Sequence, residues 1–139
     1  MTVKELGHMA ETYHGQWGDY CKPPHAPHMS LKADWLDTGR RVLRQLAKEL
    51  GLEKGTFDIR KNAGGSAVSG ESTLHGEWIY VQLGQSCTGL GFMWRYCTGR
   101  KDYTGMSNNW ASWKELLDLP KLAKKMKDQM PHEVRERVG

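Results

Sequence analysis

The sequence lacks the features that define several large classes of protein. It has only 3 cysteines in 139 residues, whereas small secreted domains stabilised by disulfides carry a denser and usually even set. No segment approaches the ~20 consecutive apolar residues that a transmembrane helix needs. The first 30 residues contain no apolar stretch typical of a secretory signal. We therefore expect a cytoplasmic chain with reduced thiols and no membrane partner.

Recognisable catalytic motifs are also missing. The sequence contains neither a G-x-S-x-G nucleophile elbow nor a phosphate-binding loop with its lysine. A catalytic cysteine needs a base within hydrogen-bonding distance, and nothing in the sequence places His75 beside Cys87 or Cys97. Glu71 and Glu77 are expected to be exposed charges on strands or turns. We therefore predict a protein that is not an enzyme and binds no cofactor. The alternative is a small-ligand-binding or enzymatic protein that uses the glycine-rich loops.

The N-terminal residues 1–29 contain a group of candidate metal ligands. Cys21, His25 and His28 follow one another at short spacing, and His14 lies seven residues before Cys21. Zinc sites use such ligands in tetrahedral sets, but this spacing matches no standard zinc motif. The prolines in this segment disfavour a helix. We therefore predict an extended arm without a metal, and a metal site there is the open alternative.

What the sequence does contain fits one domain with an adequate core. Its 139 residues match the usual length of a single domain, and 6 tryptophans supply large apolar groups for the interior. The 20 basic and 16 acidic residues leave a net charge of +4. This charge is compatible with a polyanionic partner but does not require one.

The clearest predicted element is a helix between Ser30, a residue type that caps helix N-termini, and Gly51, a typical C-terminal stop. Apolar residues recur between them at helical spacing, namely Leu31, Trp35, Leu36, Val42, Leu43, Leu46, Ala47 and Leu50. The opposite side is basic and carries Lys32, Arg40, Arg41, Arg44 and Lys48. Gly39 lies in the helix interior, where glycine costs about 1 kcal/mol against alanine, and predicts a close approach to another element.

From residue 56 the apolar pattern changes to a period of two, which is typical of strands. The strands are expected at residues 56–61, 66–74, 77–83 and 92–97. The short, glycine-containing connections between them predict a four-stranded antiparallel meander. Residues 98–109 are expected to form a polar loop.

Two helices are expected to complete the domain. Asn108 or Asn109 can cap the first, which runs through Trp113, and Pro120 suits the first position of the second. The predicted fold class is therefore α+β, with a basic amphipathic helix, a four-stranded sheet and C-terminal helices on one sheet face. We divide the chain into an extended arm at 1–29, one domain at 30–130 and a frayed tail at 131–139.

One face of the sheet is expected to carry aromatic side chains, because aromatic residues alternate along residues 77–83 and 92–97. Tryptophan, tyrosine and arginine are enriched in the hot spots of protein interfaces. That face is either a contact surface or a second buried layer beneath the N-terminal arm, and the sequence leaves both open. The predicted partner-contacting residues are Arg40, Arg41, Arg44, Lys48, Trp78, Tyr80, Trp94, Arg95, Arg100, Lys101 and Tyr103.

Direct binding of RNA or DNA is the main alternative to a protein partner. The helix at residues 30–51 and the lysine-rich segment after Pro120 both have a basic outer side. Arg100 and Lys101 add positive charge in the polar loop, and aromatic side chains beside Arg95 can stack on unpaired bases. Acidic residues are interspersed among these cations, so a solvated basic surface is equally compatible with the sequence.

Part of the chain resembles short uncharacterised proteins of bacteriophages and prophages. The resemblance spans roughly residues 56–113 and is carried by residues 57–71, 74–76, 80–82, 99–103 and 108–109. That group has no activity to transfer, but it implies a small accessory protein that acts by binding. The implied function is an inhibitor that sterically blocks a bacterial nucleic-acid-handling or defence complex, for example an anti-CRISPR protein. The expected partner is a bacterial protein or ribonucleoprotein complex in the host cytoplasm, and a homodimer through the sheet face is a further alternative.

Overall fold

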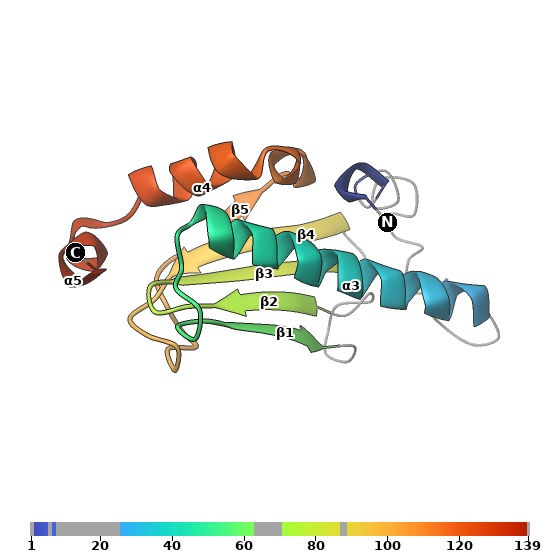
Figure 1. The fold of residues 1–139 in the computed structure, drawn as a ribbon, viewed down its shortest axis with the longest axis horizontal. Helices are drawn as coiled ribbons and strands as arrows, with labels where there is room; N and C mark the ends of the chain where they lie inside the picture. The colour runs from blue at the N-terminus through green and yellow to red at the C-terminus, as the bar shows by residue number, and fades with distance from the viewer. Residues whose placement is uncertain (1, 6, 8–25, 63–70, 87–88, 139) are drawn as a thin grey trace.

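The computed structural model of the chain describes residues 2–5, 7, 26–62, 71–86 and 89–138. Its elements, labelled as in Figure 1, are α3 (Ala26–Glu49), β1 (Asp58–Asn62), β2 (Glu71–His75), β3 (Ile79–Ser86), β4 (Gly89–Tyr96), β5 (Asn109–Ala111), the 3-10 helix η1 (Trp113–Leu117), α4 (Leu119–Asp128) and α5 (His132–Val138). Most of the expected N-terminal arm, with Cys21 and His25, lies outside the described residues.

The five strands form one antiparallel sheet in the order β1-β2-β3-β4-β5. Each strand pairs with the next along the chain, which confirms the α+β class and the meander. The expected number of four strands was wrong, because β5 pairs with β4 where the polar loop was expected to lead into a helix. A strand of 3 residues leaves no recognisable period in a sequence.

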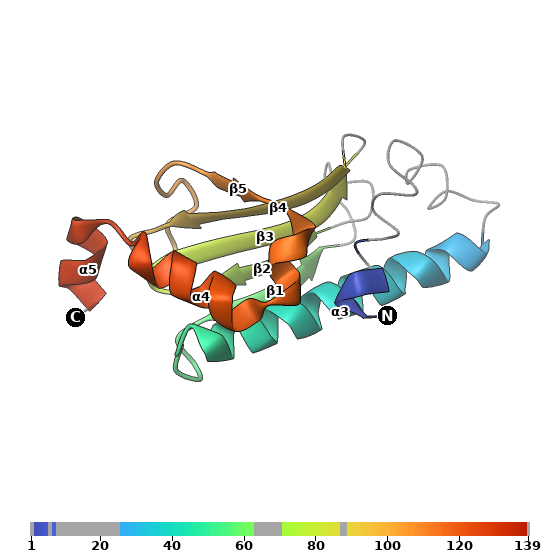
Figure 2. The same ribbon diagram turned by 90° about the horizontal axis from the view of Figure 1, so that it is seen from above.

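The helices cover one face of this sheet (Figures 1 and 2). α3 packs against β1 and β2, and α4 lies beside α3. The Tyr96 hydroxyl of β4 donates a hydrogen bond to the Met126 carbonyl of α4 at 2.6 Å, which places α4 over the other half of the sheet. No helix within the described residues lies on the opposite face, and none of them has the length and apolar character of a membrane span.

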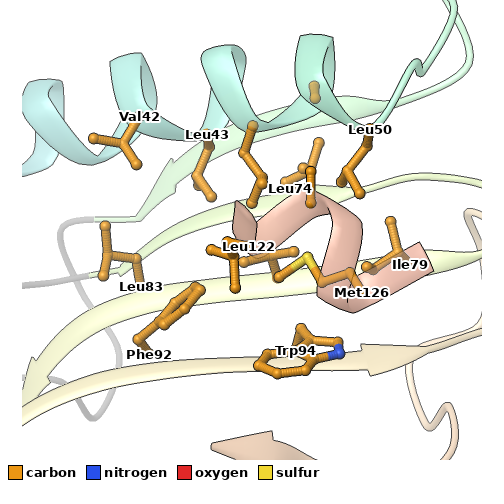
Figure 3. Packing of buried hydrophobic residues seen from close by; sticks show 14 of the residues in the cluster. Val42, Leu43, Leu50, Leu74, Ile79, Leu83, Phe92, Trp94, Leu122 and Met126 are labelled. Carbon is orange, nitrogen blue, oxygen red and sulfur yellow. The ribbon is translucent and has the colours of Figure 1, made fainter. Parts of the chain in front are cut away.

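The core lies between the helices and the sheet, as Figure 3 shows. Leu43 of α3, Leu83 of β3 and Met126 of α4 are completely buried in it. The predicted apolar side of the first helix is confirmed, because its described members from Trp35 to Leu50 all belong to the buried core. Alternate residues of β3 and β4 supply the sheet's contribution.

The first helix begins earlier than expected. α3 starts at Ala26, ahead of the predicted cap at Ser30, and so includes Pro27 in its first turn. Proline is tolerated there because the first N–H groups of a helix have no helical acceptor. The expectation of an extended arm over residues 1–29 was therefore wrong for residues 26–29, which belong to α3.

The close approach predicted at Gly39 is confirmed. A Cβ atom added to Gly39 would lie 2.8 Å from Oγ and 3.1 Å from Cβ of Ser72 on β2. The Ser72 hydroxyl also donates a hydrogen bond to the Leu36 carbonyl at 3.1 Å. Helix and strand therefore meet at a glycine–serine contact that leaves no room for a methyl group.

Gly39→Ala is expected to lower the free energy of unfolding by about 1–2 kcal/mol. Overpacking against Ser72 outweighs the gain of about 1 kcal/mol in helix propensity. Urea denaturation followed by circular dichroism measures the change. Gly99→Ala is the matched control, because a Cβ atom there meets nothing within 4 Å. A stabilised Gly39→Ala protein would show that α3 can move off β2 without loss.

The capping residue of the first C-terminal helix differs from the prediction. Ser112, rather than Asn108 or Asn109, caps η1, and Glu115 completes a capping box with it. The asparagines lie too early because β5 intervenes between them and the helix. Pro120 lies in the first turn of α4, as predicted.

The tail is folded rather than frayed. Within residues 131–139, α5 buries Val134, which is 3 % exposed. Arg137 donates a hydrogen bond to the Cys97 carbonyl at the end of β4, at 2.6 Å. Burial of Val134 and the hydrogen bond from Arg137 thus attach α5 to the rest of the domain. The local sequence of residues 131–139 did not predict these long-range contacts.

Candidate functional site

The sheet face opposite the helices, which we call the open face, is the candidate functional site. Residues directly opposite each other in antiparallel strands share a face. One row of such partners across β1 to β4 consists of Asp58, His75, Tyr80 and Arg95. The row lies beneath residues 97–108, which we call the recognition loop.

Tyr103 of the recognition loop completes an aromatic cluster on this row. The His75 ring lies 5.2 Å from the Tyr80 ring and 5.4 Å from the Tyr103 ring, edge-on to both. The guanidinium carbon of Arg95 lies 4.5 Å from the centre of the Tyr80 ring, and Arg95 donates to the Tyr103 carbonyl at 3.0 Å. Tyr103 is nevertheless 65 % exposed. It is positioned on one side and accessible to a partner on the other.

Tyr80 is also fixed by polar neighbours. Its hydroxyl donates to Gln82 at 3.2 Å, and the Gln82 amide donates to Glu71 at 3.2 Å. Burial, with a contribution from Glu71, raises the pKa of Tyr80 above its usual value. The phenol therefore stays neutral near pH 7 and serves as a hydrogen-bond donor rather than as a base.

The recognition loop is organised around Asp102. One carboxylate oxygen accepts hydrogen bonds from the amide and hydroxyl of Thr98 at 2.9 and 3.1 Å. The other accepts from the amide and hydroxyl of Thr104 and from the amide of Gly105, at 3.1, 2.9 and 2.9 Å. These bonds, that of the Gly105 amide foremost, hold the pKa of Asp102 well below its usual range. The loop is thus closed on a carboxylate that stays ionised near neutral pH.

Further contacts attach the recognition loop to its neighbours. Arg100 lies 2.7 Å from the Asp58 carboxylate of β1 and donates to the Gly55 carbonyl at 2.9 Å. The hydrogen bond from Arg100 lowers the pKa of Asp58, and the same contact raises the pKa of Arg100. His75 Nε2 lies 3.1 Å from the Gly99 carbonyl of the loop. The loop is therefore tied to β1 and β2 as well as to β4.

Two adjoining hollows lie among the recognition loop and the first strands. The smaller has a volume of about 130 Å³ and is lined by Asp58, Arg60, Thr73, His75, Tyr80, Arg100 and Tyr103. The larger has a volume of about 530 Å³ and shares Asp58, Arg60, Arg100 and Tyr103 with it. Aromatic rings and guanidinium groups thus surround a space that suits an anchoring side chain of a partner.

Trp110 is the open-face residue that sequence reasoning missed. It lies on β5 opposite Met93 of β4, and Met93 pairs with Gln82 of β3, so Trp110 shares the face of Tyr80. It is 69 % exposed, more than any other large hydrophobic residue among those described. The sequence offered one signal for the exposure of Trp110. This tryptophan lies in a short segment rich in asparagine and serine, where no apolar periodicity predicts burial.

The structure separates the predicted partner-contacting residues into three groups. Those on the open face or its recognition loop are Tyr80, Arg95, Arg100, Lys101 and Tyr103. Those on α3, on the other side of the sheet, are Arg40, Arg41, Arg44 and Lys48. Those in the core are Trp78 and Trp94, which are 8 % and 1 % exposed.

A single aromatic face is therefore ruled out by the strand register. Tyr80 pairs with Arg95, whereas Trp94 pairs with Val81. Because neighbouring residues of a strand point to opposite faces, Tyr80 lies on the open face and Trp94 faces the helices. The placement of Trp94 in a contact surface was wrong for this reason. The placement of Trp78 there was also wrong, because Trp78 precedes β3 and is buried in the core, with its ring stacked 6.4 Å from that of Tyr96.

The candidate metal ligands His14, Cys21 and His25 lie outside the described residues, and so does the side chain of His28. Cys97 is buried, and burial raises the pKa of its thiol, which makes it a weak nucleophile near pH 7. Cys87 lies outside the described residues. Among those described, no group of three or more histidine, cysteine, aspartate and glutamate side chains is arranged to hold a metal.

Comparisons with known proteins give no match, since no protein-family model, no curated protein and no solved structure is significantly similar to this chain.

Proposed function

We propose that the protein is a non-enzymatic binding protein that contacts a protein partner through the open face of its sheet. The observation that carries this proposal is the exposure of two large aromatic residues on that face, Tyr103 at 65 % and Trp110 at 69 %. Large aromatic rings and arginine dominate interface hot spots because they bury much area and pair well with a partner. Tyr103 is also held by Arg95 of the same face.

The charge of the open face favours a protein over a nucleic acid at this surface. Its cations are Arg60, Arg95, Arg100 and Lys101, and its anions are Asp58, Glu71, Glu77 and Asp102. These charges balance, whereas a surface that binds phosphates needs an excess of cations. Aromatic residues and arginine surrounded by a polar rim are typical of protein–protein interfaces.

The rigidity of the recognition loop supports the same proposal. Asp102 closes the loop from within, and Arg95 fixes the Tyr103 backbone to the sheet. A contact residue that is already held in place loses little conformational freedom when a partner binds, so less of the interaction energy is offset. Tyr103 is in this sense prepared for contact before a partner arrives.

The identity of the partner is the part of the proposal that rests on the resemblance to phage proteins. The resembling segment, residues 56–113, contains all five strands and the recognition loop, and therefore the whole open face. The function proposed on this basis is steric inhibition of a bacterial nucleic-acid-handling or defence complex, such as a CRISPR effector. The surface that occludes the complex is then the open face.

Tyr103→Ala/Trp110→Ala is expected to weaken partner binding at least tenfold without unfolding the protein, because both side chains are exposed hot-spot candidates. The tagged protein is used to capture partners from a bacterial lysate treated with nuclease, and the captured proteins are quantified. Leu117→Ala/Val138→Ala removes two other exposed apolar side chains and should leave capture unchanged. Equal capture by both double variants would contradict the open-face proposal. The capture is repeated with a lysate that has not been treated with nuclease. Partners that are captured only from the untreated lysate would replace the proposal by direct nucleic-acid binding.

A further inference from the structure

The positive charge of the protein is concentrated on the second half of α3 and on the segment of η1 and α4. Residues 40–49 of α3 together with residues 114–128 of η1 and α4 contain nine lysines and arginines but four acidic residues, a net charge of +5. The whole chain has a net charge of +4, so everything outside these two segments has a net charge of −1. We call the exposed side of these two segments the basic helix face.

The two segments form one surface on the side of the sheet away from the open face. α3 and α4 lie side by side over the same sheet face (Figure 2), and the Lys127 ammonium donates to the Glu49 carbonyl at 3.2 Å where their C-terminal ends meet. Each helix buries its apolar stripe, with Leu46 of α3 and Met126 of α4 completely buried. Most of the charged residues, Arg44, Lys48 and Lys121 among them, are therefore left on the solvent side of both helices.

Several cations of this face are available to a ligand. Arg44, Lys48 and Lys121 are exposed, and within the described residues their side chains have neither an ion pair nor a hydrogen bond. Lys124 and Lys125 have acidic partners at 2.6 and 2.8 Å. The Lys124 pair is exposed and contributes little to stability, whereas Lys125 is held by the partly buried Glu115 and lies over the Trp94 ring.

Helix stability alone does not account for these positions. Cations near a helix C-terminus are favoured by the helix dipole, which explains Lys48 in the last turn of α3. Lys121, however, lies in the first turn of α4, where the dipole disfavours a positive charge. Arg44 lies more than one turn before the end of α3. Charge is thus present where the fold does not need it.

We propose that the basic helix face binds the phosphate backbone of double-stranded nucleic acid. Lysine and arginine side chains that neutralise phosphates release condensed counterions, and this release drives binding. A duplex is favoured over a single strand because, among the described residues, no exposed aromatic side chain lies on this face to stack on unpaired bases. Contacts of this kind position a duplex without reading its sequence.

This interaction is independent of the protein contact proposed for the open face, because the two surfaces share no residue and lie on opposite sides of the sheet. Binding here is expected to be salt-dependent. Contacts to three phosphates by Arg44, Lys48 and Lys121 correspond to a slope of about −2.7 in log affinity against log salt concentration.

Fluorescence anisotropy of a labelled duplex DNA of mixed sequence, titrated with the full chain at about 50 mM salt and above, tests the proposal. Arg44→Glu/Lys48→Glu/Lys121→Glu is expected to lower affinity at least tenfold. The matched control, Lys54→Glu/Arg60→Glu/Lys101→Glu, changes the net charge equally on other surfaces and is expected to stay within about twofold of the wild type. Circular dichroism establishes that both triple variants are folded.

Three results would overturn the proposal. The first is the absence of wild-type binding to the duplex at the lowest salt concentration. The second is an equal loss of affinity in both triple variants, which would assign binding to net charge rather than to the basic helix face. The third is binding to vesicles containing phosphatidylserine, but not to the duplex, with the same dependence on Arg44, Lys48 and Lys121, which would assign the face to a membrane surface.

Discussion

Trp94→Ala is expected to lower the free energy of unfolding by about 3–5 kcal/mol, the range observed when large aromatic residues are removed from a core. The Trp94 side chain is 1 % exposed. Its ring centre lies 6.3 Å from that of Phe92, and the Lys125 ammonium of α4 lies 5.5 Å away. The substitution leaves a cavity between β4 and α4 that the remaining side chains cannot fill. Urea denaturation followed by circular dichroism measures the loss.

Trp110→Ala is the matched control for this substitution. It removes the same side chain from the neighbouring strand, but Trp110 is 69 % exposed, so the expected change in stability is within about 0.5 kcal/mol. Trp110→Ala should instead weaken partner binding, whereas Trp94→Phe, which keeps an aromatic ring in the core, should not. Equal destabilisation by the two alanine substitutions would contradict the assignment of the two sheet faces.

The contrast between these tryptophans shows what the sequence could predict about the sheet. Alternation along each strand was visible, and it correctly grouped Phe92 with Trp94. The relation between neighbouring strands depends on register, which is fixed by tertiary packing and leaves no mark in the period of either strand. The sequence therefore could not show that Tyr80 shares its face with Arg95 rather than with Trp94.

Long periodic elements were predicted more successfully than short ones. The helix through Leu43 and Leu46 was recognised because its apolar stripe repeats over several turns. β5 was missed because its stability comes from pairing with β4, not from a local pattern. α5 was missed for the same reason, since Val134 and Arg137 attach it to distant parts of the chain.

The recognition loop was predicted only as a polar segment, although one signal for its organisation was present. Asp102 is followed three residues later by Gly105, a combination typical of turns in which the aspartate side chain accepts backbone N–H groups. Gly105 has a φ of +62°, and a Cβ atom there would lie 2.8 Å from Arg95. The hydrogen bonds that Thr98 donates to the same carboxylate could not be predicted, because Thr98 and Asp102 approach each other only in the folded loop.

The arrangement of the two proposed surfaces is consistent with an occluding inhibitor. The sheet separates the open face from the basic helix face, so a protein partner and a duplex can be held at the same time. A binder of this kind can block a nucleic-acid-handling complex by docking on its protein surface beside the nucleic acid. The two triple variants test the duplex contact, and the two double variants test the protein contact. Either proposal can therefore fail without affecting the other.

Asp102→Ala is expected to release the recognition loop, lowering hydrogen-exchange protection of the Thr98 and Gly105 amides by roughly a hundredfold. Five hydrogen bonds to an ionised acceptor are lost together in this variant. Asp102→Asn should have an intermediate effect. Its single carbonyl oxygen can keep the contacts to Thr104 and Gly105, but its amide group then faces the Thr98 N–H donor. Protection is therefore expected to fall at Thr98 and to persist at Gly105.

Release of the loop should also weaken partner binding at least tenfold, because Tyr103 must then be ordered when the partner binds. Asp128→Ala is the matched control. It removes an exposed carboxylate that pairs with Lys124 on the basic helix face, and it should change neither loop protection nor binding at the open face. Unchanged partner affinity in Asp102→Ala would show that the recognition loop takes no part in the interface.

The same carboxylate determines how the loop responds to pH. The pKa of Asp102 is lower in the folded loop than in the unfolded chain, so ionisation favours the closed loop. Its contribution is complete above the unfolded pKa of about 4 and is lost as the pH falls through the folded value. Protection factors at Thr98 and Gly105 should thus stay constant from about pH 8 to about pH 5 and fall only in strong acid. A loss of protection between pH 7 and 5 would contradict the assignment of the loop's pH response to Asp102.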